Sequence, residues 1–253
     1  MNKKLNYILI SNDDGYESVG LKVLLNIAEQ LADNVLIVSP KINQSAKSKS
    51  ITIKQNINFR EMSKNFWIVD GTPTDCMIFA LNHLFNKNKP DLILSGINAG
   101  SNIGDEVSYS GTVAAAWEGA VRGIDSIALS QYGGDDKINS YECSQAKGFD
   151  IINYLLKIKS QTPRFYNVNF PFIISSNLEN VRSSFTTLAS QKIADEILFD
   201  DDFSSFMIGR MINDHSSLIN TDLECLKKNK ISITPLSLNL SNNEFFNKMN
   251  HDI

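Results

Sequence analysis

The sequence has few of the residues that build disulfide frameworks and zinc centres. Its three cysteines, Cys76, Cys143 and Cys225, are far apart and odd in number, and no pair has the spacing of a metal site. They are therefore expected to be reduced thiols. The three histidines are equally scattered, at positions 83, 215 and 251, which argues against a histidine-based metal site.

Long hydrophobic runs and an excess of positive charge are also missing. No stretch approaches the ~20 apolar residues that span a bilayer. The N-terminal "MNKKLNYILISNDD" runs into two acids and lacks a small-residue cleavage site, unlike a signal peptide. The formal net charge of -4 argues against a dedicated nucleic-acid binder, which usually has a basic face. We expect a cytoplasmic protein whose partners include neither nucleic acid nor a membrane.

Three sequence motifs of nucleotide-binding and hydrolytic enzymes are absent. The turn after the first predicted strand has no G-x-G-x-x-G, which argues against a dinucleotide cofactor. The chain has no G-x-x-x-x-G-K-[ST] and no G-x-S-x-G. It is therefore neither a P-loop NTPase nor a hydrolase with a nucleophile elbow.

What the sequence does have is a regular alternation of apolar runs and helical patterns. Its 253 residues and 42% hydrophobic content suit one large domain with a sizeable core. The alternation predicts a Rossmann-like, open and mostly parallel α/β sheet with helices on both faces. Strands are predicted at 7–11, 34–40, 65–71, 90–96, 125–131 and 164–171, and helices at 19–34, 73–85, 112–123 and 143–159.

The last third of the chain gives a weaker signal. Residues 172–229 are polar and weakly periodic, so we expect irregular or hairpin structure there, followed by a strand within 230–241. We predict a single domain over 1–253. Its residues 172–253 are expected to include a C-terminal extension used in oligomerisation.

Polar loops follow three of the predicted strands. Asp13 and Asp14 follow the first strand, the segment 39–50 is polar and rich in Ser, and the segment 97–112 is rich in Ser, Asn and Gly. The carboxyl ends of parallel strands meet at one edge of a sheet, so these loops should share a crevice. Carboxylates with neutral oxygens suit Mg²⁺ or Mn²⁺. The alternative, two unrelated turn acids, is the better interpretation of the opening residues taken alone.

A helix is predicted to begin at "YSGT". Ser110, Gly111 and Thr112 stand where free backbone N–H groups and the positive end of the helix dipole favour an anion. The alternative is that Ser110 or Thr112 is simply an N-cap. Beside a dicarboxylate metal site, phosphate binding becomes the preferred interpretation.

The sequence resembles the SurE (survival protein E) family in several segments. These are "ILISNDDG" at the start, "NQSAKSKSIT" after the second strand, "DGTPTDC" at 70–76 and "SGINAGSNIGDEVSYSGTVAAAWEG" at 95–119. "NVNFP" at 167–171 and "ISITPL" at 231–236 resemble later landmarks of the family. The similarity is dense over 1–131 and thin beyond it.

The resemblance implies a Rossmann-like nucleotidase that assembles as a homodimer or homotetramer. The expected reaction is hydrolysis of nucleoside 5′- and 3′-monophosphates, and of short polyphosphate in some members, with one divalent metal ion per subunit (Mg²⁺ or Mn²⁺). By motif, the implied metal ligands are Asp13, Asp14, Ser45 and Asn98. Loop position alone does not single out Ser45 or Asn98.

Three departures from the family pattern are visible. Ser48-Lys49 stands where members commonly have Gly-His, and Lys49 is not a neutral base near pH 7, although it can contact phosphate as a cation. Asn220 opens "NTD" where many members have "GTD". Residues 185–195 lack the expected Arg-rich stretch. These departures bear on the expected substrate preference and assembly, and they leave the implied metal ligands unchanged.

The expected mechanism is in-line attack of a water on the phosphate. Asp13 or Asp14 is a candidate general base, and Asn12 or Asn102 would orient phosphate or water. Ser110, Gly111, Thr112 and Lys49 are the candidate substrate contacts. An aspartyl-phosphate intermediate ranks second, because a metal-bound acid is a poorer nucleophile. A phosphatase for other small monoesters and a non-catalytic nucleotide-binding regulator remain as alternative functions.

Overall fold

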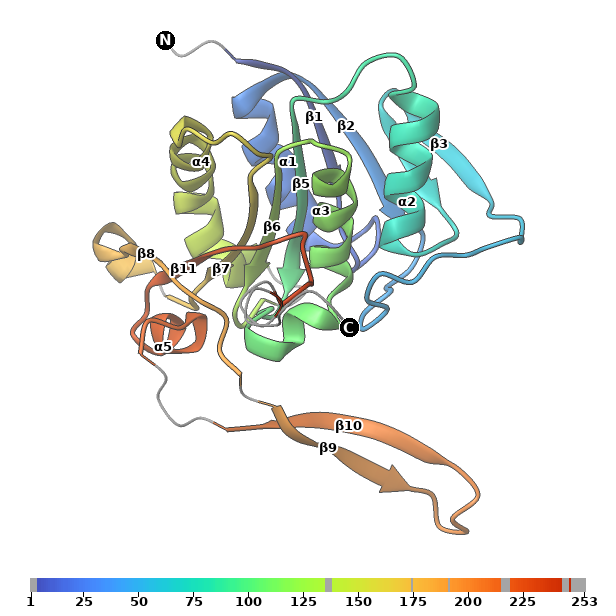
Figure 1. The fold of residues 1–253 in the computed structure, drawn as a ribbon, viewed down its shortest axis with the longest axis vertical. Coiled ribbons are helices and arrows are strands. Elements are labelled where there is room, and N and C mark those ends of the chain that lie inside the picture. Colours follow the sequence, from blue (N-terminus) through green and yellow to red (C-terminus); the bar gives the residue numbers. More distant parts are fainter. Residues whose placement is uncertain are drawn as a thin grey trace.

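A nine-stranded sheet organises the molecule in the order β3-β4-β2-β1-β5-β6-β7-β11-β8 (Figure 1). The computed structural model describes residues 4–134, 138–173, 175–190, 192–214, 219–242 and 246. The run from β4 to β7 is parallel, as predicted, while β3 pairs antiparallel with β4 and β11 pairs antiparallel with β7 and parallel with β8. The strands are β1 Leu5–Ser11, β2 Ala32–Pro40, β3 Phe59–Ser63, β4 Phe66–Val69, β5 Leu92–Ala99, β6 Ser126–Gln131, β7 Phe165–Phe170, β8 Ser183–Phe185 and β11 Ile231–Pro235.

Helices cover both faces of the sheet, because successive strand residues point to opposite sides. Ile8 and Ile10 of β1 belong to one core with Leu24 of α1, whereas Leu9 belongs to the other core with Met77 of α2. The α/β class and the two-sided covering are thereby confirmed. The longer helices are α1 Val19–Leu31, α2 Pro73–Phe79, α3 Gly111–Val121 and α4 Glu142–Lys157. Short turns of 3-10 or π helix are η1 Ala80–Leu84, η2 Gly104–Ser108, η3 Ile138–Tyr141 and η4 Ser175–Asn180.

The sheet changes its winding direction between β1 and β5. From β1 the chain moves outward to β2 and β4, and it then returns to β5 and continues through β6 and β7 on the other side. Such a switch point opens a crevice at the carboxyl ends of the two strands. The turn that follows β1 carries Asp13 and Asp14, and Asn98 lies near the carboxyl end of β5.

The C-terminal third contributes to the main sheet and also extends away from it. β11 lies antiparallel to β7, and β8 is added at the edge. In the chain segment between β8 and β11, β9 Lys192–Phe199 and β10 Phe206–Asn213 form a separate antiparallel hairpin that projects from the molecule (Figure 1). The predicted hairpin is confirmed, whereas α5 Asp222–Lys227 and β8 were not predicted.

Two further features concern the cysteines and the helices. All three cysteines are buried and unpaired. None of the helices in the described ranges is long and apolar enough to cross a membrane.

Candidate active site

The turn after β1 sends its two acids into different surroundings. Asp13 is buried, with 4% of its surface exposed, while Asp14 is half-buried. Gly15 follows with a φ of +95°, which residues with a side chain rarely adopt. A Cβ there would lie 3.1 Å from the Ile42 carbonyl carbon. The glycine therefore lets the chain leave the strand sharply, beside the loop that follows β2.

The first turn of α3 holds the Asp13 carboxylate. The Thr112 hydroxyl donates a hydrogen bond to Asp13 Oδ1, and the Thr112 backbone N–H also supports that carboxylate. A Cβ on Gly111 would lie 2.8 Å from the Cβ of Asp13, so only glycine allows this approach. The positive helix end thus faces Asp13 itself. Ser110 is the N-cap, since its hydroxyl accepts from Val113 N at 3.0 Å.

Asp13 is held at an electrostatic cost. Burial first, and the neighbouring Asp14 carboxylate second, raise the pKa of Asp13 from 3.8 to about 6, although the Thr112 bonds oppose the rise. Two close carboxylates with one of them out of water favour either a proton or a cation between them. The pair therefore fits a divalent ion better than it fits two unrelated turn acids.

Asp14 connects this turn to the end of β5. Its Oδ2 accepts a hydrogen bond from the Ala99 backbone N–H at 2.9 Å, which places Asp14 next to Asn98. The Asn98 amide nitrogen donates to the Gly100 carbonyl at 3.0 Å. The amide oxygen of Asn98 is consequently the atom left for a ligand.

The loop after β2 reaches the same place through its backbone. Gln44 N donates to the Asp13 carbonyl at 2.7 Å, so Ser45 directly follows a residue that is fixed to Asp13. Ser45 is exposed, and its backbone N–H donates to Asn43 Oδ1. The loops of all four suggested metal ligands are thus joined around Asp13 and Asp14.

The donor set is chemically suited to a hard divalent cation. It offers two carboxylates, one amide oxygen and one hydroxyl, which matches the oxygen ligands of Mg²⁺ or Mn²⁺. Within the described ranges, no three His, Cys, Asp or Glu side chains group together as a metal site. His215 and His251 lie outside those ranges. The four residues stay predicted ligands.

Two of the predicted catalytic or binding asparagines are engaged in bracing the site. The Asn12 amide donates to the Gly15 carbonyl and to Ser18 Oγ, each at 2.8 Å, and its Oδ1 accepts from Ser39 at 2.6 Å. Asn12 therefore fixes the acidic turn to the start of α1 and the end of β2. Its contacts suit a positioning role.

Asn102 is similarly fixed from the other side of the crevice. Its amide donates to Ser130 Oγ at 2.7 Å, and its backbone carbonyl accepts from the amides of Asn167 and Asn169. These residues belong to β6 and β7. The network anchors the loop after β5 to the parallel sheet.

Lys49 makes a contact that the sequence did not suggest. Its amine lies 3.9 Å from the centroid of the Trp117 ring, a cation–π contact. Both residues line a cavity of about 290 Å³ that Ser110 also lines. Lys49 is thus beside the α3 N-terminus, as a substrate contact would be.

Sequence reasoning missed the residue that holds the end of the second loop. The Asp75 carboxylate accepts from Thr52 N and Thr52 Oγ1, and from Thr72 N in a capping box at the start of α2. The "TPTD" pattern could have indicated this cap. Its long-range bonds to Thr52 could not be read from the sequence.

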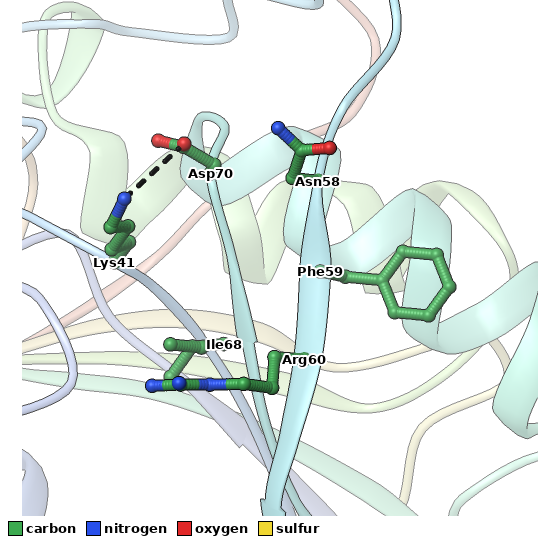
Figure 2. Close-up of a pocket in the computed structure, with 6 residues that line it drawn as sticks. All are labelled: Lys41, Asn58, Phe59, Arg60, Ile68 and Asp70. Atoms are coloured by element: carbon green, nitrogen blue, oxygen red, sulfur yellow. Dashed lines mark ion pairs between the residues drawn. The ribbon is translucent and has the colours of Figure 1, made fainter.

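A second cavity lies on the neighbouring edge of the sheet. Figure 2 shows Lys41, Asp70 and Arg60 around it, with Lys41 Nζ 3.5 Å from Asp70 Oδ2 and the Phe59 ring turned to the other side of β3. None of the predicted site residues lines this cavity. The residues gathered around Asp13 are therefore the better candidate.

Comparison with known proteins gives a consistent result. The family model described as "Survival protein SurE" matches residues 8–195. The protein named 5'-nucleotidase SurE from Paramagnetospirillum magneticum is 39% identical over 240 residues, covering 94% of this chain and 92% of its own length. Its namesake from Methylorubrum populi is 35% identical over 238 residues, covering 92% and 94%.

A solved structure shares the fold over nearly the whole chain. The crystal structure of the SurE protein from Aquifex aeolicus has a TM-score of 0.82 and 29% sequence identity. The match covers 96% of this chain and 98% of that one. The similarity includes the C-terminal third, where the sequence resemblance is thin.

Proposed function

The chain belongs to the survival protein SurE family, and from this premise we propose that it is a divalent-metal-dependent nucleotidase. Its substrates would be nucleoside 5′- and 3′-monophosphates, with short polyphosphate as a further substrate. The observation that carries the proposal is the meeting of Asp13 and Asp14 with the loops of Ser45 and Asn98 at the switch point of the sheet. Relatives named 5'-nucleotidase align over more than nine-tenths of the chain.

One Mg²⁺ or Mn²⁺ per subunit would be held by Asp13, Asp14, Ser45 and Asn98. Such an ion supplies Lewis acidity toward a phosphate oxygen and lowers the pKa of a bound water. The chain's own part is to keep Asp13 ionised and oriented through Thr112. The helix end also offers the N–H of Gly111 and the hydroxyl proton of Ser110 to phosphate oxygens.

The proposal makes Thr112 a positioning residue for Asp13. Its hydroxyl is committed to that carboxylate, so it is the less suitable donor to phosphate. Lys49 would contribute positive charge near the substrate. Asn12 and Asn102 would hold the two loops at a fixed separation.

We further propose that the β9–β10 hairpin joins copies of the chain into a homodimer or homotetramer. Apolar side chains are exposed along both strands and at the tip, including Ile197, Phe203, Phe206 and Ile208. The ring contacts of Phe199 are with Phe203 and Phe206 of the same hairpin. An apolar surface of this kind on a projecting two-stranded ribbon is expected to be covered by a partner.

The test is phosphate release from a panel of nucleoside monophosphates and sugar phosphates, with Mg²⁺, with Mn²⁺ and with EDTA. We expect turnover of nucleotides that EDTA abolishes. Asp13→Asn should lose nearly all activity, while Asp33→Asn, an exposed acid at the opposite end of β2, should retain it. Faster turnover of sugar phosphates than of nucleotides would indicate the other phosphatase class. No turnover of any substrate would indicate a regulatory protein.

A further inference from the structure

The cavity beside the α3 N-terminus combines apolar walls with the ammonium of Lys49, the one charged group among the described residues that line it. Val113 and Trp117 of α3 and Phe165 of β7 line it, and Lys49 and Ser110 add polar groups. We call it the base pocket. Its volume of about 290 Å³ is at the small end of the range for small-molecule sites.

The base pocket adjoins the first turn of α3, which holds Asp13. Ser110 lines the pocket, and the next two residues, Gly111 and Thr112, contact Asp13. Trp117 lies five positions beyond Thr112 on the same helix, about 7.5 Å along its axis at ~1.5 Å per residue. A ligand with phosphate at the helix end would therefore extend its remaining part into the pocket.

The walls of the base pocket are firmly held. The Trp117 ring packs edge-on against Phe165, with centroids 5.9 Å apart. Leu236 N donates to the Phe165 carbonyl at 2.8 Å, which fixes the segment after β11 along the pocket. Figure 1 shows this red segment running from β11 toward the first turn of α3.

Lys49 is held by anchors on both sides. Before it, Ser48 N donates to the Tyr109 carbonyl at 3.0 Å, and Ser48 Oγ donates to the Ser108 carbonyl at 2.7 Å. After it, the Ser50 carbonyl accepts from Thr72 Oγ1 at 2.7 Å. The backbone that presents the ammonium to the Trp117 face is therefore preorganised.

These groups define which ligand fits. Aromatic and aliphatic walls accept a flat ring, and a lysine ammonium can only donate hydrogen bonds. A base with a carbonyl oxygen beside a ring nitrogen offers the acceptors that lysine binds, as guanine does through O6 and N7. Adenine presents an amino donor at the same position.

On the basis of the proposed nucleotidase activity, we propose that the base pocket binds the nucleobase of the substrate and that Lys49 favours 6-oxopurines over 6-aminopurines. IMP and AMP provide the sharpest comparison, because oxygen replaces an amino group at purine C6. Lys49 is then a specificity-determining residue. Ribose 5-phosphate, which lacks a base, serves as the reference substrate.

The experiment compares Lys49→Met with Lys47→Met, an exposed lysine of the same loop that does not line the pocket. The ratio of kcat/KM for IMP to that for AMP should fall at least about tenfold in Lys49→Met, because the variant loses a hydrogen bond from a charged donor to the base. It should be unchanged in Lys47→Met. An unchanged ratio in Lys49→Met would overturn the role of the lysine.

A second variant tests the pocket itself. Ala114→Leu places a larger side chain at the wall and should lower kcat/KM for both nucleotides toward the ribose 5-phosphate value, with folding checked by circular dichroism. Nucleotide turnover like that of the parent chain in the folded variant would overturn the pocket assignment.

Failure of the proposed function is recognised separately. If the parent chain hydrolyses no phosphate ester, the nucleotidase proposal fails, and the base pocket is then tested by calorimetric binding of IMP. Weaker IMP binding to both variants, Lys49→Met and Ala114→Leu, supports the pocket. Equal binding by the parent chain and both variants overturns it.

Discussion

Replacing Asp13 by asparagine should stabilise the metal-free protein while removing its activity. The carboxylate is buried beside Asp14, and its pKa is raised from 3.8 to about 6. Below about pH 4 the group is protonated in both the folded and the unfolded chain. Between about pH 4 and pH 6 the unfolded chain has lost this proton while the folded chain still binds it, so stability falls across that window and levels off above it.

The rise in the pKa of Asp13 corresponds to a cost of about 3 kcal/mol at pH 7. An asparagine avoids this cost, and its side-chain oxygen can still accept the Thr112 hydroxyl proton. For a chain of this size, about 3 kcal/mol is roughly 6–12 °C in melting temperature.

The assay is urea denaturation of both chains in EDTA at pH 4 and pH 7.5. Asp13→Asn should be more stable than the parent at pH 7.5, and the two should be nearly equal at pH 4. Added Mn²⁺ should stabilise the parent alone. An Asp13→Asn chain that is less stable at pH 7.5, or an advantage of the same size at both pH values, would refute the electrostatic reasoning.

Three further predictions concern neighbouring features. Gly111→Ala places a Cβ 2.8 Å from the Cβ of Asp13. It should lower the free energy of unfolding, measured by urea denaturation, by about 1–3 kcal/mol and should abolish most phosphate release. Full activity would show that the close approach of α3 to Asp13 is not needed. Ser48→Ala loses the hydrogen bond from Ser48 Oγ to the Ser108 carbonyl, which should change stability by about 1 kcal/mol. Its kcat/KM for AMP should fall severalfold relative to that of the control Ser50→Ala. Equal kcat/KM in the two variants would show that this hydrogen bond does not position Lys49. Ile208→Ser on the exposed hairpin should shift the assembly toward monomers in light scattering without lowering monomer stability; an unchanged mass would exclude the hairpin as the contact.

The parallel interior of the sheet could be predicted because it is buried on both faces. Such strands, β1 and β5 among them, appear in the sequence as continuous apolar runs between polar turns. β3 has no such signal, since all five of its residues are exposed at the sheet edge. The six-residue α5 is too short to show helical periodicity.

The candidate site could be located from the sequence, but its internal bonds could not. Adjacent acids after the first strand mark the switch point of a doubly wound sheet. The Thr112–Asp13 bond joins residues 99 positions apart, and the Gly104–Asp222 bond joins residues 118 positions apart. Contacts of this kind depend on tertiary packing, which local periodicity does not encode. The sequence therefore suggested Thr112 as a phosphate contact, whereas its hydroxyl is bonded to an acid.

The Lys49 position shows the same limit in a different form. The sequence presents a lysine in a polar loop, with phosphate as the obvious partner. Its contact with Trp117 depends on Ser48 being fixed to the turn before α3. The proposed specificity for a base could not be predicted from either segment alone.

Asp13, Asp14, Ser45 and Asn98 are proposed to bind one divalent ion together. Anomalous diffraction from crystals of the protein grown with Mn²⁺ measures this directly. We expect one anomalous peak per subunit within about 2.0–2.4 Å of oxygens from these four side chains. An anomalous map with no peak between the two carboxylates, or with the peak on other residues, would contradict it.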